Sequence, residues 1–289
     1  MKVCTVVALA MISSVASAQN AQTEIDAHLT AARNAAGFDF TGTLARLCVA
    51  PPFTTGIRDA APGKPPARET WFTEPAKVFD NLYFVGSKIH SSWALTTSDG
   101  IILIDTLFTY NSEEEIVDGL KKLGLDPSKV KYVIITHAHS DHVGGAKLMQ
   151  DRFKSRIIMG GPDWDAIEKS VHGYPEGKPK RDIVADDGQK LTLGDTTVTI
   201  LTTPGHTPGS QSLLVHLKNS GFIILSGDVV HSEHKFEKNI VPTLNTDKAA
   251  SIASMEKIKR MIGTYHAKLF INHDKAQADT LKLLPAFYD

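Results

Sequence analysis

Metal-binding side chains are concentrated in one short segment near the middle of the chain, which reads THAHSDHVGG over residues 136–145. Imidazole nitrogens and carboxylate oxygens suit Zn²⁺, at ligand distances of about 2.0 to 2.2 Å. Three imidazoles and a carboxylate that leave water together need a compensating cation. These side chains cannot all share one face of a helix or strand, so we expect a loop at a strand end that wraps around a metal centre. The candidate ligands are His137, His139, Asp141 and His142.

Three more candidate ligands follow apolar runs further along the chain. His206 lies in TPGHTPGS, Asp228 in SGD and His273 in NHD. Loops at strand ends are where a rigid sheet presents functional groups, so we expect these residues to join the first cluster. Isolated histidines are interpreted instead as ordinary surface or core residues, and these are His90, His172, His216 and His266.

Short β-type runs and a few helices must position these loops. Two similar halves of strands mixed with helices predict an α/β fold, in which two sheets pack face to face with helices outside. Strands are expected over 82–85, 94–97, 101–104, 132–136, 156–159, 197–201, 213–216 and 222–225. Helices are expected over 112–123, from about 146, near 163–170 and over 247–262.

The helix expected over 112–123 carries its own start and stop signals. Ser112 followed by Glu115 predicts a capping box, in which each side chain bonds the other residue's backbone N–H. Gly124 is expected to end the helix, because glycine readily adopts the left-handed conformation there.

The N-terminal part of the chain is expected to lie outside the folded domain. Residues 1–18 combine Lys2, an apolar run and a small-residue site at 16–18, which predicts a signal peptide cleaved after Ala18 and export to a periplasm or the medium. The apolar run is too short for a membrane anchor, which needs about 20 apolar residues. Residues 19–70 are expected to form an N-terminal helix, over 22–47, and a proline-rich arm.

The charge balance excludes some classes of partner. The formal net charge is −1 and the pI is about 6.9, so the chain has no strong positive field for nucleic acid or an anionic membrane surface. A small, neutral or weakly charged substrate fits better.

The ordered set HAHSDH, PGHTPGS, GD and a late histidine resembles the metallo-β-lactamase superfamily, over a domain of residues 71–289. The resemblance implies a four-layer αββα sandwich with two Zn²⁺ ions in a groove at one edge of the sheets, although such ligands also accept Mn, Fe or Co. Asp105 matches an acidic position of the family and is expected to orient a ligand. In the implied ligand set, His137, His139 and His206 hold one ion, Asp141, His142 and His273 hold the other, and Asp228 bridges them.

The implied activity is metal-dependent hydrolysis, with a metal-activated hydroxide as nucleophile and Asp141 orienting it and carrying a proton. The chain looks most like the N-acyl homoserine lactonases, which act in quorum quenching, because of the Gly227–Asp228 position and the tail over 272–289. Many of these lactonases have a tyrosine three residues after the bridging aspartate. His231 stands there in this chain and is expected to donate the equivalent hydrogen bond to the substrate carbonyl.

Two other functions stay open at the level of sequence. The predicted export and the stretch over 71–86 are also similar to metallo-β-lactamases with three-histidine and Asp-His-His sites. However, Val229 and His231 stand where that subclass uses serines. A metal-stabilised binding protein is disfavoured, because structural zinc sites are closed cages that are usually rich in cysteine. The arm before residue 71 is expected to cover an acyl-chain groove or a partner copy in a homodimer.

Overall fold

The computed structural model describes residues 65–170 and 174–280, together with Ala27 and Ala31. The predicted signal peptide, the helix over 22–47 and nearly all of the proline-rich arm lie outside these residues and stay predictions. The sheets described below belong to one compact unit, Thr54–Asp289. In the described part of the chain, none of the helices has the length and apolar character needed to span a bilayer.

The first sheet has seven strands in the order β1-β2-β3-β4-β5-β6-β7. Strands β1 to β4 form antiparallel neighbours, whereas β4 to β7 run parallel to one another. Parallel neighbours need crossover connections, and helices supply them here. The strands are β1 (Ala76–Lys77), β2 (Leu82–Phe84), β3 (Trp93–Thr97), β4 (Gly100–Ile104), β5 (Val130–Ile134), β6 (Arg156–Gly160) and β7 (Ile183–Ala185). The helical segments are η1 (Arg68–Thr70), η2 (Glu113–Asp118), α3 (Gly119–Lys122), η3 (Pro127–Lys129), α4 (Ser140–Val143), α5 (Ala146–Phe153) and α6 (Gly161–Lys169).

The second sheet has five strands in the order β12-β11-β10-β9-β8. Strands β8 to β11 form an antiparallel meander, and β12 returns parallel to β11 after the long helix α8. The strands are β8 (Lys190–Leu193), β9 (Thr196–Thr202), β10 (Gln211–Leu217), β11 (Gly221–Leu225) and β12 (Lys268–Phe270), and the helices are α7 (Glu233–Glu237), α8 (Lys248–Tyr265) and α9 (Lys275–Thr280).

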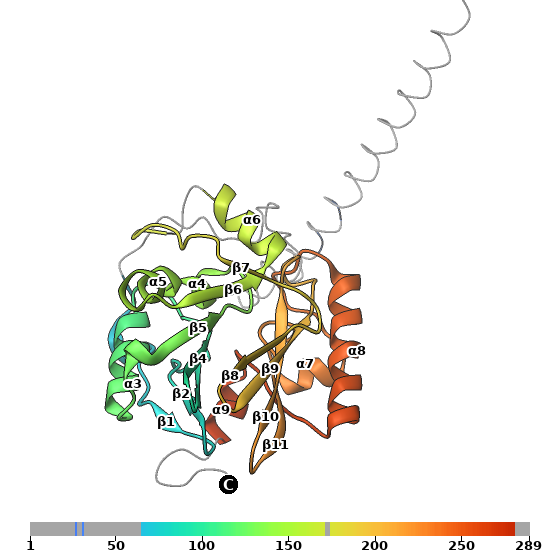
Figure 1. Ribbon diagram of the computed structural model, residues 1–289. Coiled ribbons are helices and arrows are strands. Elements are labelled where there is room, and N and C mark those ends of the chain that lie inside the picture. The colour runs from blue at the N-terminus through green and yellow to red at the C-terminus, as the bar shows by residue number, and fades with distance from the viewer. Residues whose placement is uncertain (1–26, 28–30, 32–64, 171–173, 281–289) are drawn as a thin grey trace, which may run out of the picture. The chain divides into compact units, whose positions relative to one another are not determined.

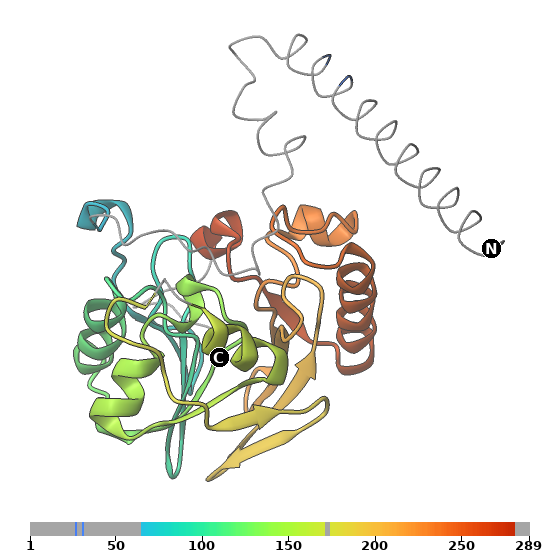
Figure 2. The ribbon, with the colours of Figure 1, turned by 90° about the horizontal axis from the view of Figure 1, so that it is seen from above.

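Alternation of apolar side chains along the strands builds the layers. In β4, Ile101 and Leu103 pack toward the helices, whereas Ile102 and Ile104 pack between the sheets. In β10, Leu214 instead joins a cluster with α8. Three apolar clusters therefore separate four layers, with α3 and α5 outside one sheet and α8 outside the other (Figures 1 and 2). The predicted αββα sandwich is confirmed.

The start predicted for the helix over 112–123 is wrong in its details. Ser112 already has helical dihedrals, φ −62° and ψ −35°, and its side chain makes no capping bond. The chain turns earlier, because the Ser112 N–H donates to the Phe108 carbonyl at 3.0 Å. Glu115 accepts from the Thr73 N–H at 3.1 Å instead of from Ser112. Gly124 ends the segment as predicted, with φ +75°.

Candidate metal centre

Every loop that carries a candidate ligand leaves the end of a strand. Strands β4 and β5 run parallel, as do β11 and β12, so their carboxyl ends point to the same edge of each sheet. His137 and His139 lie in the loop after β5, as expected. The expectation of a loop is wrong for Asp141 and His142, which lie on the helical turn α4. Gly144 lets the backbone of residues 107–109 pack closely against the end of this turn, because a Cβ there would lie 2.4 Å from the Thr109 nitrogen.

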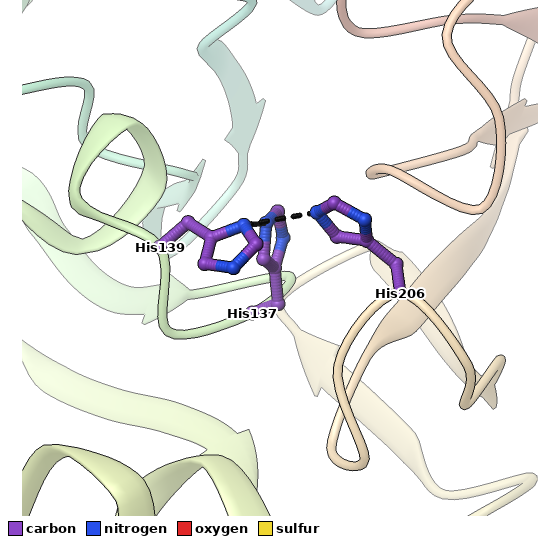
Figure 3. A group of neighbouring side chains, drawn as sticks. All are labelled: His137, His139 and His206. Carbon is purple, nitrogen blue, oxygen red and sulfur yellow. Dashed lines mark hydrogen bonds between the residues drawn. The ribbon is translucent and has the colours of Figure 1, made fainter. Parts of the chain in front are cut away.

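The first group of donor atoms consists of three buried imidazoles. His139 Nδ1 lies 2.9 Å from His137 Nε2 and 2.9 Å from His206 Nε2. Figure 3 shows the three rings converging on a common point from two different loops. Two ligands of a tetrahedral zinc ion stand about 3.3 Å apart when the metal–nitrogen distance is near 2.05 Å. This group could therefore hold one metal ion after small adjustments.

The second group surrounds the carboxylate of Asp141. Its Oδ2 lies 3.6 Å from His142 Nε2 and 3.5 Å from His273 Nε2. Both separations match the spacing of ligands around one ion and exceed that of a normal hydrogen bond.

Asp228 lies between the two groups. Its Oδ2 is 3.4 Å from His206 Nε2 and 2.9 Å from His273 Nε2. Its Oδ1 is 3.4 Å from His142 Nε2 and accepts a hydrogen bond from Asn272 Nδ2 at 3.0 Å. One carboxylate thus faces donor atoms of both groups.

The hydrogen bonds behind the imidazoles fit a bound metal. His206 Nδ1 lies 2.7 Å from the Leu244 carbonyl, and His273 Nδ1 lies 2.9 Å from the Ile89 carbonyl. An oxygen that can only accept fixes the proton on Nδ1 and leaves the Nε2 lone pair directed into the site, as in known metal-binding histidines.

The charge balance also fits a divalent cation. Burial lowers the pKa of His137 well below its usual value and that of His206 to about 3, so both imidazoles are neutral, as a metal ligand requires. Burial opposes protonation of His273, but Asp228 raises its pKa to about 9. The pKa of buried His142 is likewise raised, by Asp228 and Asp105. The buried carboxylates are therefore stabilised by positive charge nearby, here the protons on His142 and His273. A bound metal ion would replace these protons.

Asp105 orients His142 from behind. Its Oδ2 lies 2.8 Å from His142 Nδ1, and its two oxygens accept from the N–H and the hydroxyl of Thr136 at 2.7 and 2.8 Å. Asp105 has a left-handed backbone, with φ 57°, which aspartate adopts more readily than most residues.

Asp163 on α6 joins the two loops that carry the first group. Its carboxylate is fully buried and accepts from the Ala138 N–H, the Gly209 N–H and the Thr207 hydroxyl, at 2.7, 2.7 and 2.8 Å. Ala138 lies between His137 and His139, so this one side chain ties their loop to the loop of His206. Asp163 was not predicted from the sequence, because it stands among other charged residues in GPDWDAIEK.

An open pocket of about 230 Å³ lies over the two groups. His231 lines it, with Nε2 3.2 Å from Asp228 Oδ2. His90, interpreted from the sequence as an ordinary surface or core residue, lines it as well. Burial lowers the pKa of His90 to about 4. Its place after β2 was only a weak signal, because His90 comes six residues after Phe84 and belongs to no motif. The lining residues are His90, Phe108, His139, Ser140, Asp141, His206, Asp228, His231, Leu244 and His273.

Relatives with curated names include N-acyl homoserine lactonases. One from Bacillus sp is 29% identical over 221 residues, covering 68% of this chain and 85% of the relative. The N-acyl homoserine lactonase AttM of Agrobacterium fabrum (strain C58 / ATCC 33970) is 30% identical over 189 residues, covering 62% of this chain and 71% of the relative.

Similar solved structures include both β-lactamases and a lactonase. A β-lactamase from Chitinophaga pinensis matches with a TM-score of 0.60 and 22% identity, covering 75% of this chain and 84% of that one. A variant of AiiA from B. thuringiensis, with N-decanoyl-L-homoserine bound at its active site, matches with a TM-score of 0.59 and 23% identity, covering 72% and 88%. At these identities the likeness shows the fold.

The family model described as the metallo-beta-lactamase superfamily matches residues 85–262. Together with the lactonase relatives, the match indicates a hydrolase, as predicted from the motifs. The clusters of histidine and aspartate indicate a divalent metal, for which zinc is the best candidate. The two-sheet sandwich and the cluster of histidines and aspartates at the strand ends agree with this match. The chain therefore belongs to the metallo-beta-lactamase superfamily.

Proposed function

We propose that this protein is a dinuclear zinc hydrolase that opens the lactone ring of N-acyl homoserine lactones. The observation that carries the proposal is the position of Asp228, whose two oxygens face donor atoms of both groups. The names of the curated relatives support the choice of substrate. In this proposal the two ions are held by His137, His139 and His206 on one side and by Asp141, His142 and His273 on the other, with Asp228 between them.

The bound ions would polarise the lactone carbonyl and lower the pKa of a water molecule to about 7. Asp141 is placed to orient that water, because its carboxylate lines the pocket. Burial alone would raise the pKa of Asp141, but His142 and His273 hold it below the usual value, so the group is an anionic acceptor. Asp141 can then take a proton and pass it to the alkoxide that leaves when the ring opens.

His231 is the proposed donor to the substrate carbonyl. It stands at the rim of the pocket, where a quarter of its side chain is exposed, and one ring nitrogen lies 3.2 Å from Asp228. A carbonyl oxygen bound beside Asp228 would therefore be within reach of the imidazole. The neighbouring Val229 is only 1% exposed and offers no polar group to a substrate.

A β-lactamase is the competing function, because solved β-lactamases share the fold. The β-lactamases with three-histidine and Asp-His-His sites use serines at these positions to hold the carboxylate of the antibiotic. This chain has a buried Val229 and the imidazole of His231 there. The lactonase proposal is therefore preferred, and a direct comparison of substrates can decide between the two.

The decisive experiment compares substrates on one zinc-loaded sample of known metal content. Ring opening of N-decanoyl homoserine lactone is followed by mass spectrometry, as the gain of one water, and hydrolysis of a cephalosporin is followed by absorbance. We expect the kcat/KM for the lactone to be well above that for the cephalosporin. The reverse order would establish the β-lactamase function, and no turnover of either with two bound ions would favour a binding protein.

Export is part of the proposal. Cleavage after Ala18 would leave Gln19 as the first residue of the mature chain. N-terminal sequencing of the protein recovered from the periplasm or the medium of the producing cell tests this. An N-terminus at Met1 in the cytoplasmic fraction would contradict it.

A further inference from the structure

His90 lies beside the second group of donor atoms, although it comes from a separate loop after β2. Its Nε2 is 3.6 Å from Asp141 Oδ2, and only 14% of its side chain is exposed. Its ring also packs edge-to-face against His273, with centroids 5.1 Å apart. His90, Asp141 and His273 offer ligand atoms that all lie within 4.8 Å of one another.

The contact between His90 and Asp141 has the spacing of two ligands of one ion. Oδ2 of Asp141 is 3.6 Å from His90, 3.6 Å from His142 and 3.5 Å from His273, so three imidazole nitrogens surround it at nearly equal distances. These separations are too long for hydrogen bonds. They fall at the upper end of the range of about 2.9 to 3.6 Å expected between adjacent ligands of a five-coordinate zinc ion, at angles of about 90° to 120°.

The ring nitrogen of His90 that points away from Asp141 has its own hydrogen-bond partner, as metal-binding histidines usually do. Its Nδ1 lies 3.3 Å from the Ser87 hydroxyl, just as His142 has Asp105 behind it. If the Nδ1 proton is donated to that hydroxyl, the Nε2 lone pair faces Asp141, as it would in a ligand.

The loop of His90 is fixed to the loop of His273. The Ile89 carbonyl lies 2.9 Å from His273 Nδ1. The next residue, Ser91, donates its N–H to the side chain of Asn272 and its hydroxyl to the carbonyl of Asn272 at 3.0 Å. These bonds set the two imidazoles in place together, which a site shared by both requires.

From this geometry we infer that His90 is an additional ligand of the second metal ion, beside Asp141, His142 and His273. The inference rests on the proposed two-metal function and adds a nitrogen ligand to the set that the motifs predict. His90 also lines the pocket, with its ring edge-to-face against Phe108 at 5.0 Å between centroids.

The test measures metal binding in the wild type and in two variants of His90. Apoprotein is titrated with Co²⁺ while the visible d–d bands and the stoichiometry are recorded, and zinc affinities are measured by competition with a chelator. We expect His90→Ala and His90→Phe to weaken one of the two sites by at least about 10-fold, since even a group that only orients a ligand contributes about 10- to 100-fold. The bands of that site should change, and those of the other should not.

His90→Phe separates ligation from packing, because it keeps an aromatic ring against Phe108 but removes both nitrogens. If His90→Phe binds both ions as tightly as wild type with the same bands, the inference is overturned. His216→Ala, which removes an exposed imidazole on β10, is the matched control and should leave both sites unchanged. If the wild type itself binds fewer than two ions, the proposed function fails first, so the two failures are distinguishable.

Discussion

At the scale of single residues, Asp105 decides which nitrogen of His142 carries the proton. Oδ2 of Asp105 accepts from Nδ1, so the lone pair of a neutral His142 lies on Nε2, which is 3.4 Å from Asp228 Oδ1. In Asp105→Asn, an amide N–H₂ in place of Oδ2 would donate to Nδ1 and move the proton to Nε2. We expect a loss of about 10- to 100-fold in affinity at one of the two sites. Competition titration with a zinc chelator measures this loss.

The matched control for Asp105→Asn is Asp126→Asn. The side chain of Asp126 is exposed and accepts from the N–H and the hydroxyl of Ser128, before η3. The same change of carboxylate to amide there should leave zinc affinity unaltered. Equal affinities in both variants would show that the contact between Asp105 and His142 does not control the tautomer.

At the scale of elements, Glu115 makes the η2 segment sensitive to pH. Glu115 is 1% exposed, and burial raises its pKa from 4.5 to about 8. Folding therefore takes up a proton between about pH 4.5 and 8, and the stability of the protein falls as pH rises through that window. Glu115→Gln does not titrate and can still accept from the Thr73 N–H. The variant should gain stability relative to wild type as pH rises, by a few kcal/mol at most at pH 8.5.

Urea unfolding of both proteins at pH 5, 7 and 8.5 measures this gain. The effect of pH on the metal centre is common to the two proteins and cancels in the difference between them. Free energies of unfolding that stay parallel over this range would show that Glu115 is not protonated in the folded state near pH 7.

Helix α6 acts on the metal centre through Asp163, which joins two loops. In Asp163→Ala, two backbone N–H groups and a hydroxyl lose a buried acceptor, and each loss costs about 1 to 3 kcal/mol. The variant should unfold at a lower temperature and bind zinc more weakly at the site of His137, His139 and His206. Asp165→Ala removes an exposed carboxylate from the same helix and should do neither. Calorimetry and zinc competition on both variants measure the two effects, and unchanged zinc affinity in a folded Asp163→Ala would limit Asp163 to a structural role.

At the scale of the whole molecule, the sandwich and the seven-residue cluster were predictable from the sequence for different physical reasons. The long strands alternate or continue as apolar runs, so β4, β9 and β10 are visible as patterns. Strands β7, β8 and β12 have three or four residues, too few to show a period. The cluster is visible because histidines rarely gather in so short a segment, and because each remaining ligand follows a strand end.

His90 and Asp163 could not be predicted in the same way. Neither belongs to a motif, and each gains its role from contacts that only the folded chain makes. His90 reaches Asp141 because Ser91 bonds to Asn272, which lies near the other end of the described chain. Asp163 faces inward because Gly209 leaves room, since a Cβ there would lie 2.6 Å from its carboxylate oxygen.

The proposed metal ions would also connect the two sheets of the molecule. His137 and His139 follow β5 of the first sheet, whereas His206 follows β9 of the second, so an ion bound to all three stabilises the folded state over the unfolded chain. A free ion concentration 100-fold above Kd contributes about 2.7 kcal/mol, which corresponds to a rise of about 5 to 10 °C in unfolding temperature. Calorimetry before and after chelation, and again after zinc is restored, should show this shift. The unfolding temperature of His206→Ala should shift less than that of wild type, because this variant loses the ligand that the second sheet contributes to that group. An unchanged unfolding temperature in fully demetallated wild type would show that no ion joins the two sheets.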